Sequence, residues 1–252
     1  MSRSLQQTLS KVPEVTLGFW IIKILATTLG ETGGDAVTMS MGLGYLLGTL
    51  IFAGVFVVAV VAQIRAKGFQ PALYWFAIIA STTVGTTLAD FSDRSLGIGY
   101  LGGTLLLSSL LVASLVVWHR ALGSINVATV RTPRAETFYW LTIMFSQTLG
   151  TALGDWTADS ARIGYAGGIL IFTGLLAVLA LAYFFTRANR TALFWFAFVL
   201  TRPLGAVVGD FLDKPLAHGG LDFSRYTATG LLLAAIVMLV ALLPQRAASK
   251  AH

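Results

Sequence analysis

Long apolar runs recur in pairs along the chain. Their first members cover roughly residues 16–33, 71–89, 136–154 and 191–209, and their second members roughly 42–64, 98–118, 163–185 and 224–243. Each run has about the 20 residues that a helix needs to cross a bilayer. The runs are uniformly apolar rather than alternating, which favours helices over the strands of a membrane barrel. The pattern therefore predicts an all-α integral membrane protein with eight transmembrane helices.

The first run of each pair carries the same signature: a tryptophan, a glycine ten residues later and an aspartate five residues after that. The four sets are Trp20, Gly30 and Asp35; Trp75, Gly85 and Asp90; Trp140, Gly150 and Asp155; and Trp195, Gly205 and Asp210. Identical spacing in four copies indicates duplication of a two-helix unit. The predicted repeats are 16–66, 71–119, 136–186 and 191–244, and the linker 119–135 joins two halves of a single membrane domain. Two spans per repeat return the chain to the same side, so we expect four parallel repeats around a pseudo-symmetry axis.

The composition agrees with a bilayer as the surrounding solvent. Of the 252 residues 56% are hydrophobic and 11% are charged, with a mean hydropathy of +0.79, whereas soluble domains carry about 25% charged residues. The absence of cysteine excludes disulfides and thiolate metal sites. Three scattered histidines are too few for an imidazole cage, so no cofactor is expected.

The charges are distributed unevenly between the two sides. Eleven basic residues lie in the termini and in the links between repeats, against only Glu14 and Glu136, while the turns inside the repeats hold four basic residues against nine acids. The positive-inside rule places both termini in the cytoplasm. It also explains the net charge of +6 without a nucleic-acid partner. The polar N-terminus lacks the features of a signal peptide, so we expect the first span to be retained.

The four Trp-x9-Gly-x4-Asp units resemble an uncharacterised family of bacterial membrane proteins, defined by four tandem repeats of two transmembrane helices with a tryptophan in each. The resemblance covers about residues 14–244. It implies the eight-helix topology and a bacterial inner membrane. It implies no activity, so function has to be argued from the residues.

The glycines and tryptophans of the signature favour structural roles. Gly30 is followed by a second small residue, Gly34, and the other three copies share this small-x-x-x-small spacing, which allows close helix packing. An alternative is that the thin helix faces line a small pore. The tryptophans lie near the cytoplasmic ends of their helices, which predicts an interfacial aromatic belt. An aromatic substrate platform is the alternative.

The four aspartates end their helices, where the helix dipole disfavours an acid, so each is expected to have a cationic partner. One hypothesis is local ion pairing of Asp90 with Arg94 and of Asp210 with Lys214, with Arg162 near Asp155. The other hypothesis is that the carboxylates of all four repeats converge on the central axis and bind a metal ion or another cation. The acids of the turns themselves, Asp93, Asp159, Asp213 and Asp222, are expected to be solvated.

Three departures from the repeat put charge inside the spans. Lys23, Glu31 and Arg202 replace residues that are uncharged in the other copies. Lys23 is expected to extend to the cytoplasmic face. Arg202 lies too deep for that and needs a partner, of which Glu31 is the obvious one; the pair would join the first and fourth repeats. Pro203 removes a backbone hydrogen bond beside Arg202, so this charge pair is also a candidate gate.

Hydroxyl and amide side chains lie one turn below the glycines. The set is Thr27, Thr28, Thr82, Thr83, Gln147 and Thr148. They either hydrogen-bond neighbouring helices or complete an oxygen-rich site for Mn²⁺, Mg²⁺, Ca²⁺, Na⁺ or protons. The sequence thus favours a small multipass transporter or exporter of a hard cation. The alternatives are a non-catalytic membrane scaffold or sensor, and a transporter of a small organic solute. No enzymatic motif is present, so an enzyme is not expected.

Overall fold

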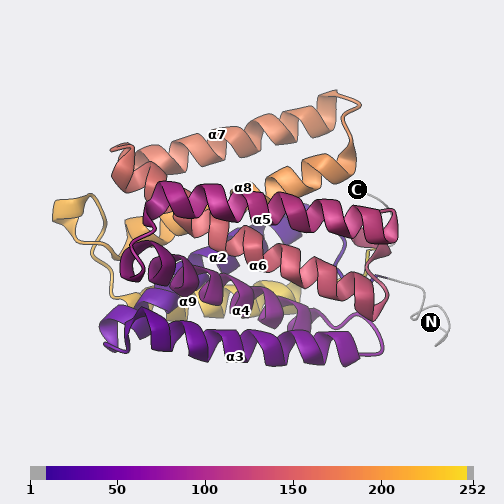
Figure 1. Cartoon of the computed structure of the whole chain (residues 1–252), viewed down its shortest axis with the longest axis horizontal. Coiled ribbons are helices and arrows are strands. Elements are labelled where there is room, and N and C mark those ends of the chain that lie inside the picture. The colour runs from indigo at the N-terminus through magenta and orange to yellow at the C-terminus, as the bar shows by residue number, and fades with distance from the viewer. Residues whose placement is uncertain (1–9, 249–252) are drawn as a thin grey trace.

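The protein is a bundle of helices, which the computed structural model describes for residues 10–248. Within this range the α-helices are α2 (Leu17–Asp35), α3 (Gly44–Arg65), α4 (Pro71–Asp90), α5 (Gly99–Leu122), α6 (Pro133–Asp155), α7 (Gly164–Phe185), α8 (Arg190–Asp213) and α9 (Arg225–Leu242). Short π-helical turns, η1 (Ala36–Ser40), η2 (Phe91–Ser95) and η4 (Trp156–Ser160), extend three of them, and the 3-10 turns η3 (Val127–Thr129) and η5 (Leu216–His218) lie in connections. The all-helical class and the eight helices that the sequence predicts are confirmed for residues 10–248 (Figure 1).

Six helices of the described part are long and apolar enough to cross a membrane: α3, α4, α5, α7, α8 and α9. The two others, α2 and α6, are richer in polar and charged side chains. Both lie in the inner part of the bundle, where neighbouring helices cover those side chains.

The first helices of the four repeats form an inner ring in which α2, α4, α6 and α8 each pack against the next, and α8 packs against α2. The second helices form an outer layer. Each packs on the first helix of the following repeat: α3 on α4, α5 on α6, α7 on α8 and α9 on α2. The two helices of one repeat therefore pack mainly on helices of neighbouring repeats rather than on each other. The contact of α9 with α2 joins the fourth repeat to the first.

The signature glycines lie where adjacent inner helices come closest. Gly150 packs under the side chain of Arg202, and Gly30 packs under Thr82 in the same way. The equivalent contacts at the other two junctions are Gly85 under Gln147 and Gly205 under Thr27. A methyl group added at any of the four glycines would lie closer than 3 Å to its neighbour. The small side chain is thus what allows the inner ring to close tightly.

The outer helices of the first three repeats begin at glycines that make a sharp turn. Gly44, Gly99 and Gly164 have φ values of +73° to +75°. Only glycine adopts this left-handed conformation without strain. The turn lets the chain reverse direction directly after the π-helical segment and run back along the bundle.

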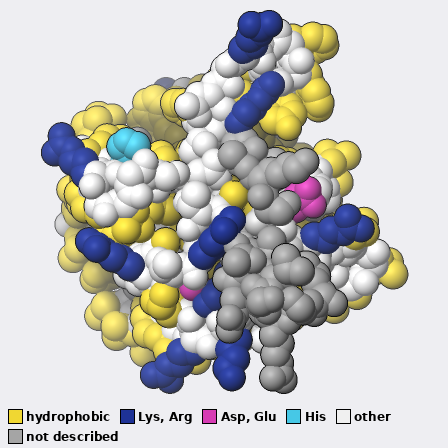
Figure 2. Space-filling view, turned by 90° about the vertical axis from the view of Figure 1, so that its right-hand side faces the viewer, with side chains coloured by type: hydrophobic (Ala, Val, Ile, Leu, Met, Phe, Trp, Pro, Cys, Tyr) yellow, Lys and Arg dark blue, Asp and Glu magenta, His cyan; other side chains and the backbone are white. Residues whose placement is uncertain are grey.

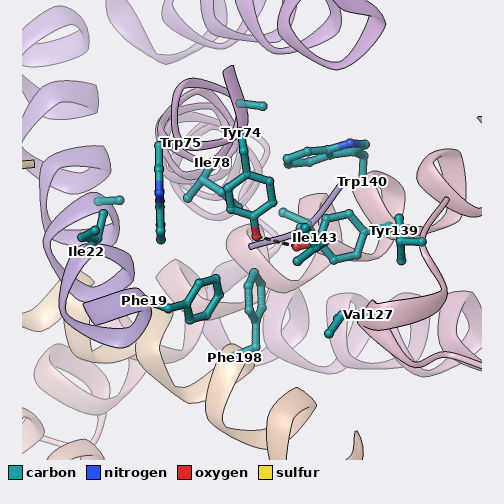
Figure 3. Packing of buried hydrophobic residues seen from close by; sticks show 14 of the residues in the cluster. Phe19, Ile22, Tyr74, Trp75, Ile78, Val127, Tyr139, Trp140, Ile143 and Phe198 are labelled. Atoms are coloured by element: carbon teal, nitrogen blue, oxygen red, sulfur yellow. Dashed lines mark hydrogen bonds between the residues drawn. The ribbon is translucent and has the colours of Figure 1, made fainter. Parts of the chain in front are cut away.

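A buried aromatic cluster fills the inner ring at the end that carries the termini (Figure 3). The residue before each signature tryptophan is aromatic and points into this cluster: Phe19, Tyr74, Tyr139 and Phe194. The hydroxyls of Tyr74 and Tyr139 are hydrogen-bonded at 2.6 Å. The expectation of an interfacial belt is wrong for Trp75, Trp140 and Trp195, which are at most 4% exposed, because their indoles pack against the rings of this cluster.

The two ends of the described part of the chain meet at the same end of the bundle. Pro13 and Ala247 form an isolated antiparallel bridge, and Lys11 forms an ion pair of 2.7 Å with Glu136 at the start of α6. Figure 2 shows this end of the molecule, where Lys and Arg side chains far outnumber acidic ones. The charge asymmetry inferred from the sequence is therefore also an asymmetry in space.

Candidate functional site: a polar core on the bundle axis

Four layers of side chains line the axis of the inner ring. Spaced four residues apart, they share one face of each helix. From the end that carries the termini, the layers are Lys23, Ile78, Ile143 and Phe198; Thr27, Thr82, Gln147 and Arg202; Glu31, Thr86, Thr151 and Ala206; and Asp35, Asp90, Asp155 and Asp210. All sixteen side chains are buried. The axial side chains therefore change from mostly apolar, with one lysine, at the end that carries the termini to acidic at the turns.

Arg202 lies at the centre of the ring. Its Nη2 donates to Glu31 Oε2 at 3.0 Å and to Thr86 Oγ1 at 2.6 Å, and it also donates to Thr151 Oγ1. These three acceptors occupy the same position in the first, second and third repeats. The ion pair that the sequence predicts between Arg202 and Glu31 is thus present, and the same nitrogen also holds the two other repeats. Nε and Nη1 have no hydrogen-bond partner within residues 10–248.

The four signature aspartates converge, and each pairs with a cation. Lys214 bridges Asp35 at 2.6 Å and Asp210 at 3.0 Å, which joins the first and fourth repeats. Arg94 bridges Asp90 at 2.9 Å and Asp155 at 3.5 Å, which joins the second and third. The two hypotheses drawn from the sequence are therefore not exclusive, because the ion pairs themselves cross between repeats. The predicted partner of Asp155, Arg162, is wrong; Arg94 of the neighbouring repeat takes its place because the ring brings it closer.

A further acid joins this network. Asp213 is buried and accepts a hydrogen bond of 3.0 Å from Arg225 Nε, which also lies 3.7 Å from Asp35. The expectation that Asp213 and Asp93 are solvated is wrong, since both are less than 10% exposed; helix packing covers the turn at these two positions. Burial lowers the pKa of Lys214, but attraction to Asp210, Asp35 and Asp213 outweighs burial and raises this pKa above its usual value. Lys214 therefore remains a cation.

The ion-pair network on the turn side carries more acids than bases. Its acids are Glu31, Asp35, Asp90, Asp155, Asp210 and Asp213, and its bases are Arg94, Arg202, Lys214 and Arg225. With every group ionised, the network has a formal charge of −2. Two sets of three carboxylates bring oxygen atoms within 4.8 Å of one another: Glu31 with Asp155 and Asp210, and Asp35 with Asp210 and Asp213. Clusters of carboxylate oxygens are the ligands that hard cations prefer.

Other predicted site residues lie apart from these carboxylates. Thr28, Thr83 and Thr148 donate to carbonyls of their own helices, at 3.0, 2.9 and 3.0 Å. Gln147 donates to Ser81 Oγ at 3.4 Å. None of these four side chains is hydrogen-bonded to an acid within residues 10–248.

Lys23 and Pro203 complete the set of asymmetric residues. The expectation that Lys23 reaches the surface is wrong: its side chain is fully buried, and its Nζ lies 3.3 Å from Thr201 Oγ1 and 4.1 Å from the centre of the Phe198 ring. Aromatic packing closes the ring below it, so the ammonium has no route outward. Helix α8 continues through Pro203, which packs beside Gly150.

Sequence reasoning missed two features of the site. One is the buried aromatic cluster. The sequence does indicate it, because an aromatic residue precedes every signature tryptophan. The other is the sharing of Lys214 and Arg94 between repeats. That sharing depends on the order of helices around the ring, which the sequence of a single chain does not state.

Comparison with known protein families matches four segments of the chain to one model, the Repeat of Unknown Function (DUF347). The matched segments are residues 18–69, 73–123, 138–189 and 193–245. No curated protein and no solved structure matches the chain. The resemblance inferred from the tryptophan signature is thereby confirmed. The four matches follow one another across almost the whole chain, which therefore belongs to the family of proteins built from this repeat.

Proposed function

We propose that the protein is a multipass transporter or exporter of a hard cation or of protons, with eight helices crossing a bacterial inner membrane and both termini in the cytoplasm. The observation that carries the proposal is the buried network with two more acids than bases, within which Glu31, Asp155 and Asp210 bring carboxylate oxygens within 4.8 Å of one another. We assign it no enzymatic role and no cofactor.

The orientation is supported by the distribution of charge. Lys and Arg side chains surround the end that carries the termini (Figure 2), and cytoplasmic loops of membrane proteins are enriched in these residues. The acidic layer then lies toward the opposite side of the membrane. The polar helices α2 and α6 cross the membrane inside the ring, where their charged groups are paired or hydrogen-bonded rather than exposed to lipid.

The excess of acids supports a cation as the ligand. An uncompensated buried charge costs several kcal/mol, and one divalent ion or two protons would neutralise a formal charge of −2. Oxygen-only coordination suits Mg²⁺, Mn²⁺, Ca²⁺ or Na⁺. A metal ion and protons would use the same carboxylates, so the two are variants of one proposal.

The position of Arg202 supports a gating role for its pair with Glu31. Glu31 belongs to a carboxylate triad and also accepts from Arg202. A cation that binds Glu31 would compete with the guanidinium for its carboxylate. It would thereby weaken the contacts by which Arg202 Nη2 joins α8 to the three other repeats. On the cytoplasmic side the buried aromatic cluster, with the Tyr74–Tyr139 hydrogen bond, closes the axis. Transport would therefore require this cluster to open.

A proteoliposome assay tests the proposal. Purified protein is reconstituted, and entry of Mn²⁺, Mg²⁺, Na⁺ and protons is followed with ion-sensitive dyes. The double variant Asp155→Asn, Asp210→Asn removes two of the clustered carboxylates, and the matched control Asp159→Asn, Asp222→Asn removes two exposed ones. We expect flux in the parent and in the control, and none in the folded cluster variant.

The alternative of a scaffold or sensor is favoured by one observation: each signature aspartate already has a basic partner. Inserted parent protein that moves neither metal ions nor protons would overturn the cation proposal. If the cluster variant then proved less stable as well, the acids would be structural, as in a scaffold. Flux of an organic solute instead would support the remaining alternative.

A further inference from the structure

A groove opens on the side of the bundle between α2, α7 and α8. Its volume is about 360 Å³. It runs from Thr16 and Arg190, at the end that carries the termini, to Thr201 at mid-depth. Apolar side chains line most of it, among them Trp20, Ile24, Leu176, Phe194 and Ala197.

The groove is a departure from the fourfold pattern. Gln63 in α3, Trp118 in α5 and Tyr183 in α7 lie at the same position, eighteen residues after the tyrosine that follows the first residue of each helix. Gln63 and Trp118 are 1% and 0% exposed, whereas Tyr183 is 42% exposed. Gln63 is covered by Lys11 of the N-terminal segment, and Trp118 packs on Tyr139 of α6. Nothing in the described part of the chain covers Tyr183 in this way, and α7 lies along one edge of the bundle (Figure 1).

The mouth of the groove is suited to an anion. Helix α2 begins at Leu17 and α8 begins at Arg190, so the positive ends of two helix dipoles face the mouth. The Arg190 guanidinium lies 4.4 Å from the ring of Tyr183 and is only partly buried. It donates to the backbone carbonyls of Tyr183 and Thr186 at the end of α7, which leaves three of its five N–H groups for an anion. Within residues 10–248 no acidic side chain lines the groove; Glu14 lines a separate crevice beside Arg246.

The length of the groove matches one lipid chain. Eleven residues of α8 separate Arg190 from Thr201, which corresponds to about 16 Å of helix. Half of the hydrocarbon core of a bilayer is about 15 Å thick. An acyl chain whose headgroup sits at Arg190 would therefore reach about as far as Thr201.

We propose that this groove holds one anionic phospholipid of the cytoplasmic leaflet, with its phosphate on Arg190 and the starts of α2 and α8, and one acyl chain along the groove. The lipid fills the space between α7 and the inner helices α2 and α8. Its chain ends at Thr201, which accepts the hydrogen bond of Lys23, so the lipid contacts a residue of the axial core. The proposal rests on membrane insertion but not on cation transport.

The test is lipid retention by the full chain in a mild maltoside detergent, measured by native mass spectrometry. The probes are dioleoyl phosphatidylglycerol and dioleoyl phosphatidylcholine, added in equal amounts. We expect one phosphatidylglycerol per chain, retained about tenfold more strongly than phosphatidylcholine, since a charge-assisted contact of about 1.4 kcal/mol is a factor of ten. Arg190→Gln should abolish this preference, and Ala197→Phe, which fills the groove, should abolish retention of both lipids.

Two matched controls separate the groove from the general surface. Arg187→Gln removes an exposed neighbouring arginine that does not line the groove, and Val58→Phe enlarges an exposed residue of α3; both should retain phosphatidylglycerol as the parent does. Equal retention of the two lipids by the parent would overturn the proposal, as would undiminished retention by folded Arg190→Gln and Ala197→Phe. A lipid-free dimer that Ala197→Phe dissociates would overturn it too, because a second copy of the chain would then cover the groove.

Discussion

The pair of Arg202 and Glu31 offers the sharpest test of how the ring is held together. Both side chains are buried, at 0% and 3% exposure, and they are joined at 3.0 Å. Removing one member of a buried ion pair leaves the other uncompensated and costs about 3–5 kcal/mol. We therefore expect Arg202→Met and Glu31→Gln each to lower the free energy of unfolding by about 3 kcal/mol or more.

The double variant should be far less damaging than the sum of the two changes, because it leaves no unpaired charge. Removing both charges of a buried pair avoids the uncompensated charge that makes each single change costly. Thr86, which also contacts the guanidinium, still donates to Gly30 O or Thr82 O when Arg202 is gone, so little hydrogen bonding is stranded. The expected coupling energy is at least about 2 kcal/mol.

The assay is reversible unfolding in mixed detergent micelles, followed by circular dichroism. Arg162→Met serves as the control, since Arg162 is exposed and forms no ion pair within the described residues; its effect should stay within about 0.5 kcal/mol. Additive losses in the double variant would refute the reasoning, because they would mean that the two charges are stabilised independently.

Three further changes test other parts of the structure by the same unfolding assay. Gly150→Ala places a methyl group against Arg202 and should destabilise the bundle by about 1–3 kcal/mol. The control Gly174→Ala adds a methyl group with no atom within 4 Å and should be neutral or slightly stabilising. Equal effects of the two changes on the free energy of unfolding would contradict the close packing of the ring. Tyr74→Phe should cost about 1–3 kcal/mol because the buried hydroxyl of Tyr139 loses its partner, and changing both tyrosines to Phe should cost less than either change alone. Because the Lys214 pKa is raised by folding, its contribution to stability is complete below its unfolded pKa of about 10.4 and is lost as the pH rises further. Lys214→Met should flatten the decline of stability above about pH 10, and an unchanged decline would show that Lys214 is not the group responsible.

Periodicity and repetition were sufficient to predict the helices, their pairing into repeats and the Arg202–Glu31 bridge. These depend on residue type and spacing, which one chain displays directly. The order of packing was not predictable in the same way. The contact of each second helix with the next repeat, and the sharing of Arg94 and Lys214 between repeats, follow from the closed ring. The buried tryptophans were misjudged for a related reason, because the same aromatic residue suits a membrane interface and a packed core equally well.

The alternation of packing partners has a consequence for synthesis. Helix α2 is made first, yet the helices that cover it from one side, α8 and α9, are made last. It is also among the more polar helices of the bundle and contains Lys23 and Glu31. During translation the ionisable groups of α2 are therefore only partly shielded until α8 and α9 have been made. Assembly of this ring depends on α9, so deletion of α9 should expose α2 rather than the helices that directly precede it in the chain.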